Sequence, residues 1–142
     1  MSNELISNNI VCLFQAYKQA MRSTLKANEI GLNAMHVKCL SYIYKAQSCT
    51  ANDIVINLNR DKAQIARLVK EMIAKNWLIK MANPEDKRSQ LLSLTHEGIS
   101  LAKLIQQTHS EINQKMQSTL TRDELKEFTR VVGIICTNLQ EP

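Results

Sequence analysis

The sequence predicts a mainly α-helical protein with a small β-hairpin wing, arranged as a winged helix-turn-helix with further helices before and after it. Apolar residues recur at helical spacing over most of the chain. Two helices with a tight join between them are predicted within residues 51–76, as a helix-turn-helix requires. Two short apolar runs then flank a charged turn, which is typical of a hairpin.

The second helix of this pair, predicted from Arg60 to Asn76, is amphipathic. Its apolar face consists of Ile65, Leu68, Val69, Met72 and Ile73. The opposite face is basic, with small residues between the charges, and consists of Arg60, Ala63, Arg67, Lys70 and Ala74. Asp61 or Asn59 is expected to cap the start, and Asn76 to end the helix, because asparagine tolerates a left-handed backbone.

The hairpin is predicted from the strand-like runs Leu78–Met81 and Leu91–Leu94, which flank the turn-forming sequence NPEDKR. Residues 60–88 hold eight Lys or Arg against four Asp or Glu, which is +4 of the formal +5 charge of the chain. Such a local positive patch indicates a nucleic-acid-binding surface. The alternative is a solvated charged helix beside an ordinary exposed hairpin.

The other helices follow from apolar spacing and from the residues that cap them. The predicted helices are Leu5–Ala27; Ala34–Lys45, capped by Asn33 after a break at Gly31; a short helix through Leu58 with a capping box of Thr50 and Asp53; a helix from Thr95 to about Ser118; and a last helix with a capping box of Thr121 and Glu124.

Three segments, RLVKEMIAKNWL, NPEDKR and LSLTHEG, resemble the MarR family of dimeric bacterial transcription regulators. The resemblance implies that the helix Arg60–Asn76 enters the major groove of double-stranded DNA and that the hairpin reaches toward the minor groove. Its most specific part is the wing pattern Asp-x-Arg, here Asp86, Lys87 and Arg88. By this resemblance Arg88 enters the minor groove, Asp86 steadies the wing through a charge-assisted hydrogen bond, and Lys87 lies on phosphate.

Several outward-facing residues of the predicted reader helix suit contacts to DNA. Arg67 in its middle and Gln64 in its first turns are expected to approach base edges, where Arg favours guanine and Gln favours adenine. Lys62 and Lys70 suit phosphate contacts, and Arg60 extends the basic face. For Gln64 the alternative is simple exposure to solvent, since half or more of protein–DNA hydrogen bonds go to the backbone.

The two ends of the chain, residues 1–30 and 95–142, are predicted to form a helical dimerisation region that is intertwined with the winged helix-turn-helix of residues 31–94. The apolar seams that favour this are Ile6, Ile10, Leu13, Phe14, Tyr17, Met21 and Leu25 in the first helix, and Leu125, Phe128, Val132, Ile135 and Leu139 in the last. From Leu101 onward five basic and five acidic residues cancel, which argues against phosphate binding there. The resemblance implies that these helices interlock between two subunits, and the alternative is packing within one chain.

The residue pattern does not favour catalysis or metal binding. His36, His96 and His109 fall in separate predicted elements without a matching Ser or Asp motif, so no enzyme is predicted. His36 and Cys39 share a helix face at H-x-x-C spacing, but structural zinc normally takes four ligands, and a pair in the core is the simpler interpretation. No metal and no cofactor is therefore predicted.

The four cysteines are scattered without a C-x-x-C pair, and no apolar run is long enough for a signal sequence or a membrane span, which predicts a cytoplasmic protein without a membrane partner. Some members of the resembled family sense oxidants through a cysteine in the first helix, and Cys12 lies near that position. Two observations argue against such a role for Cys12: Met21–Ala34 contains no accompanying tyrosine, and no basic residue lies four positions away.

Together these features predict a DNA-binding transcription regulator, with repression as the expected sign of control. The protein is expected to bind a pseudo-palindromic operator as a homodimer and to be released by a small-molecule effector or by oxidation. The alternative from another class is a winged-helix protein–protein adaptor without sequence-specific DNA binding, because winged helices are not all DNA readers.

Overall fold

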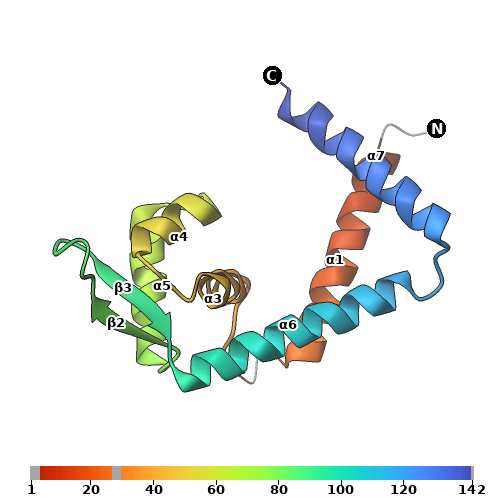
Figure 1. Cartoon of the computed structure of the whole chain (residues 1–142). Helices are drawn as coiled ribbons and strands as arrows, with labels where there is room; N and C mark the ends of the chain where they lie inside the picture. Colours follow the sequence, from red (N-terminus) through yellow and green to blue (C-terminus); the bar gives the residue numbers. More distant parts are fainter. Residues whose placement is uncertain (1–3, 27–29, 142) are drawn as a thin grey trace. The chain divides into compact units, whose positions relative to one another are not determined.

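The structure is a computed structural model that describes residues 4–26 and 30–141. The chain divides into two compact units, Met1–Thr108 and His109–Pro142. In chain order the elements are α1 (Leu5–Leu25), α3 (Ala34–Ala46), β1 (Ser48–Cys49), α4 (Ala51–Leu58), α5 (Lys62–Ala74), β2 (Leu78–Ala82), β3 (Gln90–Leu94), α6 (His96–Gln117) and α7 (Arg122–Gln140) (Figure 1). The predicted fold class, mainly helical with a small β-hairpin wing, is confirmed.

Capping boxes start α4 and α7, as predicted. At α4 the Thr50 hydroxyl accepts the Asp53 N–H at 3.1 Å, and the Asp53 carboxylate accepts the Thr50 N–H at 2.9 Å. Thr121 and Glu124 make the same reciprocal pair at α7, at 3.1 and 2.9 Å. Each box satisfies two backbone donors that have no partner inside the helix, which fixes where the helix begins.

Residues with a positive φ follow the C-terminal ends of several helices. Asn76 has φ 63°, as predicted, and turns the chain from α5 toward β2. Asn59 ends α4 at φ 51° and does not cap α5. Lys26 ends α1 at φ 52°, so this helix stops after Leu25, whereas Ala27, its predicted end, lies outside the described residues.

The reader helix α5 begins at Lys62 and not at Arg60. The reason is the backbone around Asp61, which is extended at φ −66° and ψ 140° and occupies the N-cap position, although its side chain makes no capping hydrogen bond. Arg60 therefore lies in the α4–α5 turn, where its N–H donates to the Val55 carbonyl at 3.1 Å. The prediction that Arg60 belongs to the basic face of this helix was wrong.

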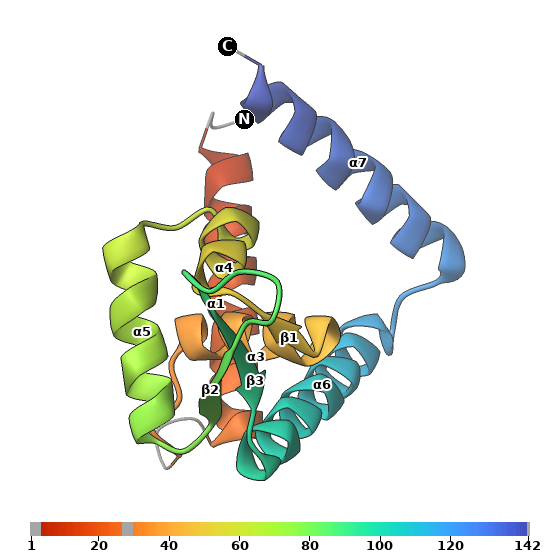
Figure 2. The ribbon, with the colours of Figure 1, turned by 60° about the vertical axis from the view of Figure 1, so that its left-hand side comes forward.

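The hairpin belongs to a three-stranded antiparallel sheet in the order β1-β3-β2. Leu78 pairs with Leu94 and Ala82 with Gln90, so the hairpin strands match the predicted runs to within one residue. Strands β2 and β3 lie side by side in both ribbon views (Figures 1 and 2). The short strand β1 was not predicted, because its two residues are too few to show alternation. Through it Cys49 pairs with Leu92 and joins the α3–α4 connection to the base of the wing.

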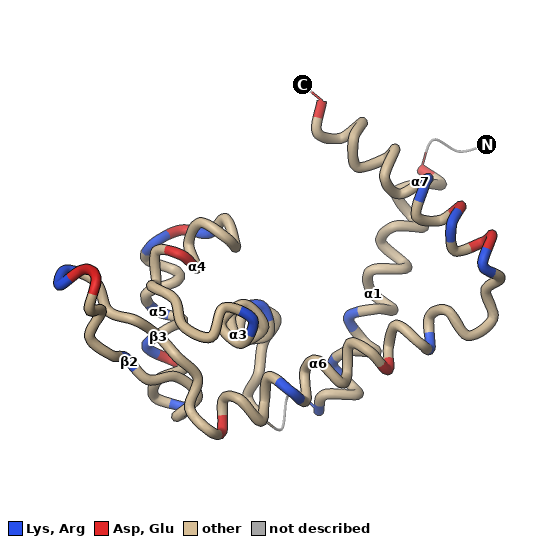
Figure 3. Tube along the Cα trace, viewed as in Figure 1, with Lys and Arg blue, Asp and Glu red and all other residues tan. Residues whose placement is uncertain are grey.

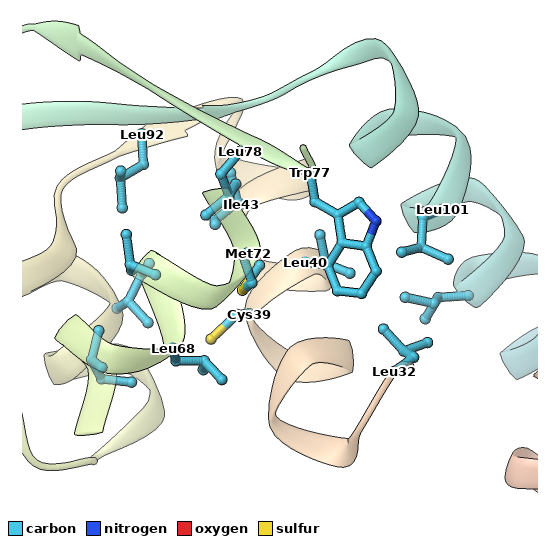
Figure 4. Packing of buried hydrophobic residues seen from close by; sticks show 14 of the residues in the cluster. Leu32, Cys39, Leu40, Ile43, Leu68, Met72, Trp77, Leu78, Leu92 and Leu101 are labelled. Atoms are coloured by element: carbon cyan, nitrogen blue, oxygen red, sulfur yellow. The ribbon is translucent and has the colours of Figure 1, made fainter. Parts of the chain in front are cut away.

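One hydrophobic core joins α3, α5, the sheet and the start of α6. Cys39, Leu40 and Ile43 from α3 meet Leu68 and Met72 from α5 beneath the sheet residues Leu78 and Leu92, while Trp77 lies between Leu40 and Leu101 of α6 (Figure 4). Four of the five predicted apolar residues of α5 are buried and Ile73 packs at the edge of the core, which confirms the amphipathic pattern. Burying such side chains contributes about 1.5–3 kcal/mol each, so α5 cannot roll about its axis without a large loss.

The first half of α1 and the whole of α7 leave apolar side chains exposed. In α1 Leu25 is buried and Met21 packs on the core, but Ile6, Ile10 and Phe14 are exposed. No residue of α7 is buried. None of the described helices is apolar enough over a sufficient length to cross a membrane.

Substitution of Gly98 by alanine tests how α6 is joined to the wing. An added Cβ would lie 2.1 Å from the Trp77 carbonyl oxygen, which cannot easily move because it also accepts the Thr95 N–H at 3.0 Å. Gly98→Ala is therefore expected to lower the free energy of unfolding by about 1–3 kcal/mol, measured by urea denaturation. Ser100→Ala, an exposed change in the same helix, is the control and should stay within about 0.5 kcal/mol of the wild type. Equal stability of Gly98→Ala and the control would refute this packing.

Candidate nucleic-acid interface

Because one face of α5 is buried in the core, the opposite face is directed toward solvent. Ile65 and Met72 are fully buried, and Gln64, Arg67 and Lys70 on the other side of the helix are exposed. The predicted residues of this face therefore point away from the core. Small residues between them leave the basic side chains accessible, as a helix that enters a DNA groove requires.

A buried histidine links α5 to α3. His36 is only 3% exposed, its Nδ1 accepts the Asn33 N–H at 3.2 Å, and its Nε2 lies 3.3 Å from the Glu71 carboxylate. Since Nδ1 accepts, Nε2 carries the hydrogen and donates to Glu71. The His36 ring also packs edge-on against the Trp77 ring, with 5.4 Å between the two ring centroids. His36 and Cys39 are thus both core residues, and within the described residues no cluster of three metal-ligating side chains occurs.

Helix α4 is capped at its start and hydrogen-bonded to α3 near its end. Its capping box holds Thr50 and Asp53 at the N-terminus, and the Asn57 amide donates to the Tyr42 hydroxyl of α3 at 3.0 Å. Because α3 also carries His36, both helices of the helix-turn-helix are tied to the same support. The Tyr42–Asn57 hydrogen bond therefore holds the C-terminal part of α4 on α3, and the capping box fixes where its first turn begins.

The wing tip, residues 83–89, projects a charged side chain into solvent. Arg88 is 96% exposed. Asp86 accepts the backbone N–H of Arg88 at 3.0 Å, while its distance to the Arg88 Nε is 3.7 Å, too long for a hydrogen bond. The Asp86 carboxylate therefore holds the backbone of the tip and forms a long ion pair with the Arg88 guanidinium, which remains exposed to solvent.

A groove of about 820 Å³ lies between α4, α5 and the wing. Among the predicted site residues it brings together Arg67, Lys70, Asp86 and Arg88. The residues that complete its lining are Thr50, Ala51, Asn52, Ala66, Val69, Lys80, Asn83, Ser89, Gln90 and Leu92. Figure 3 shows basic positions on α5 and at the tip of the hairpin. Four cations against a single carboxylate give the groove a positive character, which attracts polyanions.

Not every predicted residue lines this groove. Arg60, Lys62 and Lys87 are exposed but are not part of its lining. Gln64 lines a separate hollow of about 340 Å³ between the start of α3 and α5, together with Arg67 and Glu71.

Three polar residues that line the groove were not predicted from the sequence. Asn52 comes from the first turn of α4, Lys80 from the middle of β2, and Asn83 from the base of the wing tip. Lys80 carried a usable signal, because it is the single charged residue in the strand LIKMA. Asn52 and Asn83 carried none beyond their expected roles in a helix start and a turn.

The cysteines fall into two environments. Cys12 and Cys136 are exposed, whereas Cys39 and Cys49 are buried. Burial raises the pKa of the Cys39 thiol to about 11, and burial with the nearby Asp53 carboxylate raises the pKa of Cys49 to about 11. These two thiols are therefore held in the protonated, unreactive form at neutral pH.

Helices α3, α4 and α5 with the adjoining hairpin make up a winged helix-turn-helix, which is the class of protein that the fold and the groove define. The family model described as "MarR family" matches residues 32–90, which contain α3, β1, α4, α5, β2 and the first residue of β3. Over these residues the chain is similar to the MarR family of transcription regulators.

Named relatives show the same similarity. The "Multiple antibiotic resistance protein MarR" of Escherichia coli is 27% identical over 97 residues, which cover 68% of this chain and 67% of that protein. The "HTH-type transcriptional regulator BilQ" of Clostridioides difficile is 25% identical over 96 residues, or 68% and 65% of the two chains.

Solved structures share the fold. The reduced form of E. coli MarR has a TM-score of 0.70 at 25% identity and covers 87% of this chain and 93% of that chain. A mutant E. coli MarR, solved in complex with operator DNA, has a TM-score of 0.76 at 24% identity. The match covers 94% of this chain and 96% of that chain.

The two cysteine environments predict different rates of alkylation. At pH 8, iodoacetamide should modify Cys12 in the native protein and leave Cys39 and Cys49 intact, because at a pKa of about 11 roughly one thiol in a thousand is ionised. Raising the pH toward 11 should increase the reactivity of the buried pair. Peptide mass spectrometry measures each site, with protein unfolded in guanidinium as the control in which all cysteines react. Alkylation of Cys49 at the rate of Cys12 would contradict the burial.

Proposed function

We propose that this protein binds a pseudo-palindromic operator in double-stranded DNA as a homodimer and represses transcription until a small molecule or oxidation releases it. The observation that carries the proposal is the positive groove in which Arg67 and Lys70 of α5 face Arg88 of the wing. A helix fits the major groove, where all four base pairs are distinguishable, and an arginine on a wing reaches the neighbouring minor groove. The operator complex of the mutant E. coli MarR supports the proposal.

The proposed roles follow the geometry of the side chains. Arg67 and Gln64 approach base edges from the exposed face of α5. Lys62 and Lys70 contact phosphates beside them, and Arg60 does so from the α4–α5 turn.

At the wing, Arg88 enters the minor groove and Lys87 contacts phosphate. Asp86 holds the tip through the Arg88 N–H. Among residues that the sequence did not suggest, Lys80 joins the phosphate contacts, because it lines the same groove.

The exposed apolar residues of α1 and α7 support the proposed homodimer. Leu13 and Phe14 of α1 are more than half exposed, and Phe128 and Ile134 of α7 are about half exposed. A helix with such a face and no buried residue gains stability by packing on another helix. A second copy offers the same surface, and a two-fold dimer matches a pseudo-palindromic operator. The predicted grouping of residues 1–30 with 95–142 as the dimerisation region belongs to this proposal.

Selection of DNA fragments from the host genome tests the proposed function. The purified protein should retain fragments that share an inverted repeat, and its affinity for them should fall steeply with salt, because binding releases counterions from phosphates. Retention without any sequence preference, or binding only to acidic proteins, would favour the protein–protein adaptor instead. Cys12→Ser separates the two routes of release, since peroxide should no longer weaken binding in this variant if oxidation acts through Cys12.

Substitutions in α5 and the wing should affect DNA binding in different ways. Arg67→Ala should cost about 1–3 kcal/mol on the selected site and flatten the preference at one base pair in each half-site. Arg88→Ala should weaken binding to all variants, most where A·T pairs lie under the wing.

Lys62→Ala is the matched phosphate control. It should weaken all sequences alike and lower the slope of log affinity against log salt by about one unit per subunit. The measurement is fluorescence anisotropy with half-site variants at several salt concentrations. If Arg67→Ala left base preference unchanged and Arg88→Ala abolished it at one pair, the roles of helix and wing would be reversed.

A charge in the seam of α7 should prevent dimerisation. Ile135→Asp is expected to give monomers or aggregates in sedimentation and to abolish operator binding, because a carboxylate would replace an apolar contact in the interface. Thr137→Asp adds the same charge on the opposite, exposed side of the helix and should leave the dimer intact. A wild-type protein that sediments as a stable monomer would refute the homodimer.

A further inference from the structure

The wing tip is built from two consecutive turns with their own hydrogen bonds. The Asp86 N–H donates to the Asn83 carbonyl at 3.3 Å, and the Ser89 N–H donates to the Asp86 carbonyl at 3.2 Å. Pro84 occupies the second position of the first turn, where its fixed φ is favourable. The seven residues between β2 and β3 are therefore a folded unit and not an open loop.

A side chain reinforces each turn at its first residue. The side-chain Oδ1 of Asn83 accepts the Glu85 N–H at 3.1 Å, and the Asp86 carboxylate accepts the Arg88 N–H at 3.0 Å. Both are Asx turns, in which a side chain holds the backbone two residues further on. The second of them fixes the backbone from which the Arg88 side chain leaves.

One further hydrogen bond closes the base of the tip. The Asn83 amide nitrogen donates to the Ser89 hydroxyl at 2.9 Å, across the ends of the two turns. Both residues are half-buried, whereas residues 84–88 are exposed. Since the Asn83 oxygen is already occupied by the Glu85 N–H, the orientation of the amide is set by the two partners together.

We propose that Asn83 and Ser89 are positioning residues, whose side-chain hydrogen bond closes the wing tip and holds Arg88 in the direction in which it meets the minor groove. The inference rests on the proposed DNA binding and adds to it a reason why a side chain that is 96% exposed has a defined direction. Without this bond the second turn would be attached to the sheet by its backbone alone. The tip would then be more flexible, and Arg88 would contribute less to the affinity for DNA, because the tip would have to become ordered on binding.

A double-mutant cycle on the duplex selected by the wild-type protein tests the coupling. Ser89→Ala should weaken binding about 2- to 10-fold, the range expected for loss of one hydrogen bond, but should have almost no further effect in an Arg88→Ala background. Ser89→Thr keeps the hydroxyl and should restore wild-type affinity. Ser93→Ala, the same change in β3 outside the tip, is the control and should not alter affinity. Equal losses from Ser89→Ala in both backgrounds would overturn the proposal, since Ser89 would then act independently of Arg88.

Backbone ¹⁵N relaxation of the free protein tests the closed tip without DNA. The order parameters of residues 85–88 should fall from about 0.85 toward 0.6 in both Ser89→Ala and Asn83→Ala, while those of β2 and β3 stay unchanged. Unchanged order parameters in the tip of both variants would overturn the proposal. Failure of the wild-type protein to bind any duplex would refute the proposed function alone, because the relaxation measurement still decides whether this bond orders the tip.

Discussion

Burial of the apolar face of α5 is the constraint on which the rest of the structure depends. Ile65 and Met72 are fully buried, and Leu68 and Val69 nearly so. Exposing these side chains would cost several kcal/mol, so the rotation of the helix about its axis is fixed by the core. The basic face is then fixed as well, because it is the other side of the same helix. A surface suited to DNA is in this way determined by hydrophobic packing.

A polar contact complements this packing at the edge of the core. His36 satisfies one nitrogen at the start of α3 and the other at Glu71, and its ring contacts Trp77. A buried polar group without partners would be costly, so the pair favours one register of α3 against α5. The same α3 helix supports α4 through the bond between Tyr42 and Asn57. Both helices of the helix-turn-helix thus depend on α3.

The wing follows a different physical rule. Its base is held by the sheet, where Leu78 and Leu92 are buried. Its tip is exposed and has no core, so its conformation comes from short-range hydrogen bonds to Asn83 and Asp86. A tip of this kind leaves its cationic side chain accessible while its backbone is locally ordered. The groove combines this locally ordered tip with a helix whose orientation is set by the core.

The sequence alone determined those features that depend on residues close together in the chain. Capping at Thr50 and Thr121, the left-handed turn at Asn76 and the amphipathic face of α5 all arise within a few residues, and the structure confirms them. The start of α5 was misplaced to Arg60, because the periodic pattern continues through the extended N-cap residue Asp61, whereas the helix begins at Lys62.

Only the tertiary structure decided which of these residues share a site. Strand β1 exists because Cys49 pairs with the distant Leu92, and the contact between His36 and Glu71 joins residues 35 positions apart. Likewise Lys80 lies in the same groove as Arg67 because β2 folds back beside α5. Local propensity and spacing contain no information on such contacts, since they form only when the shared core brings separate elements together.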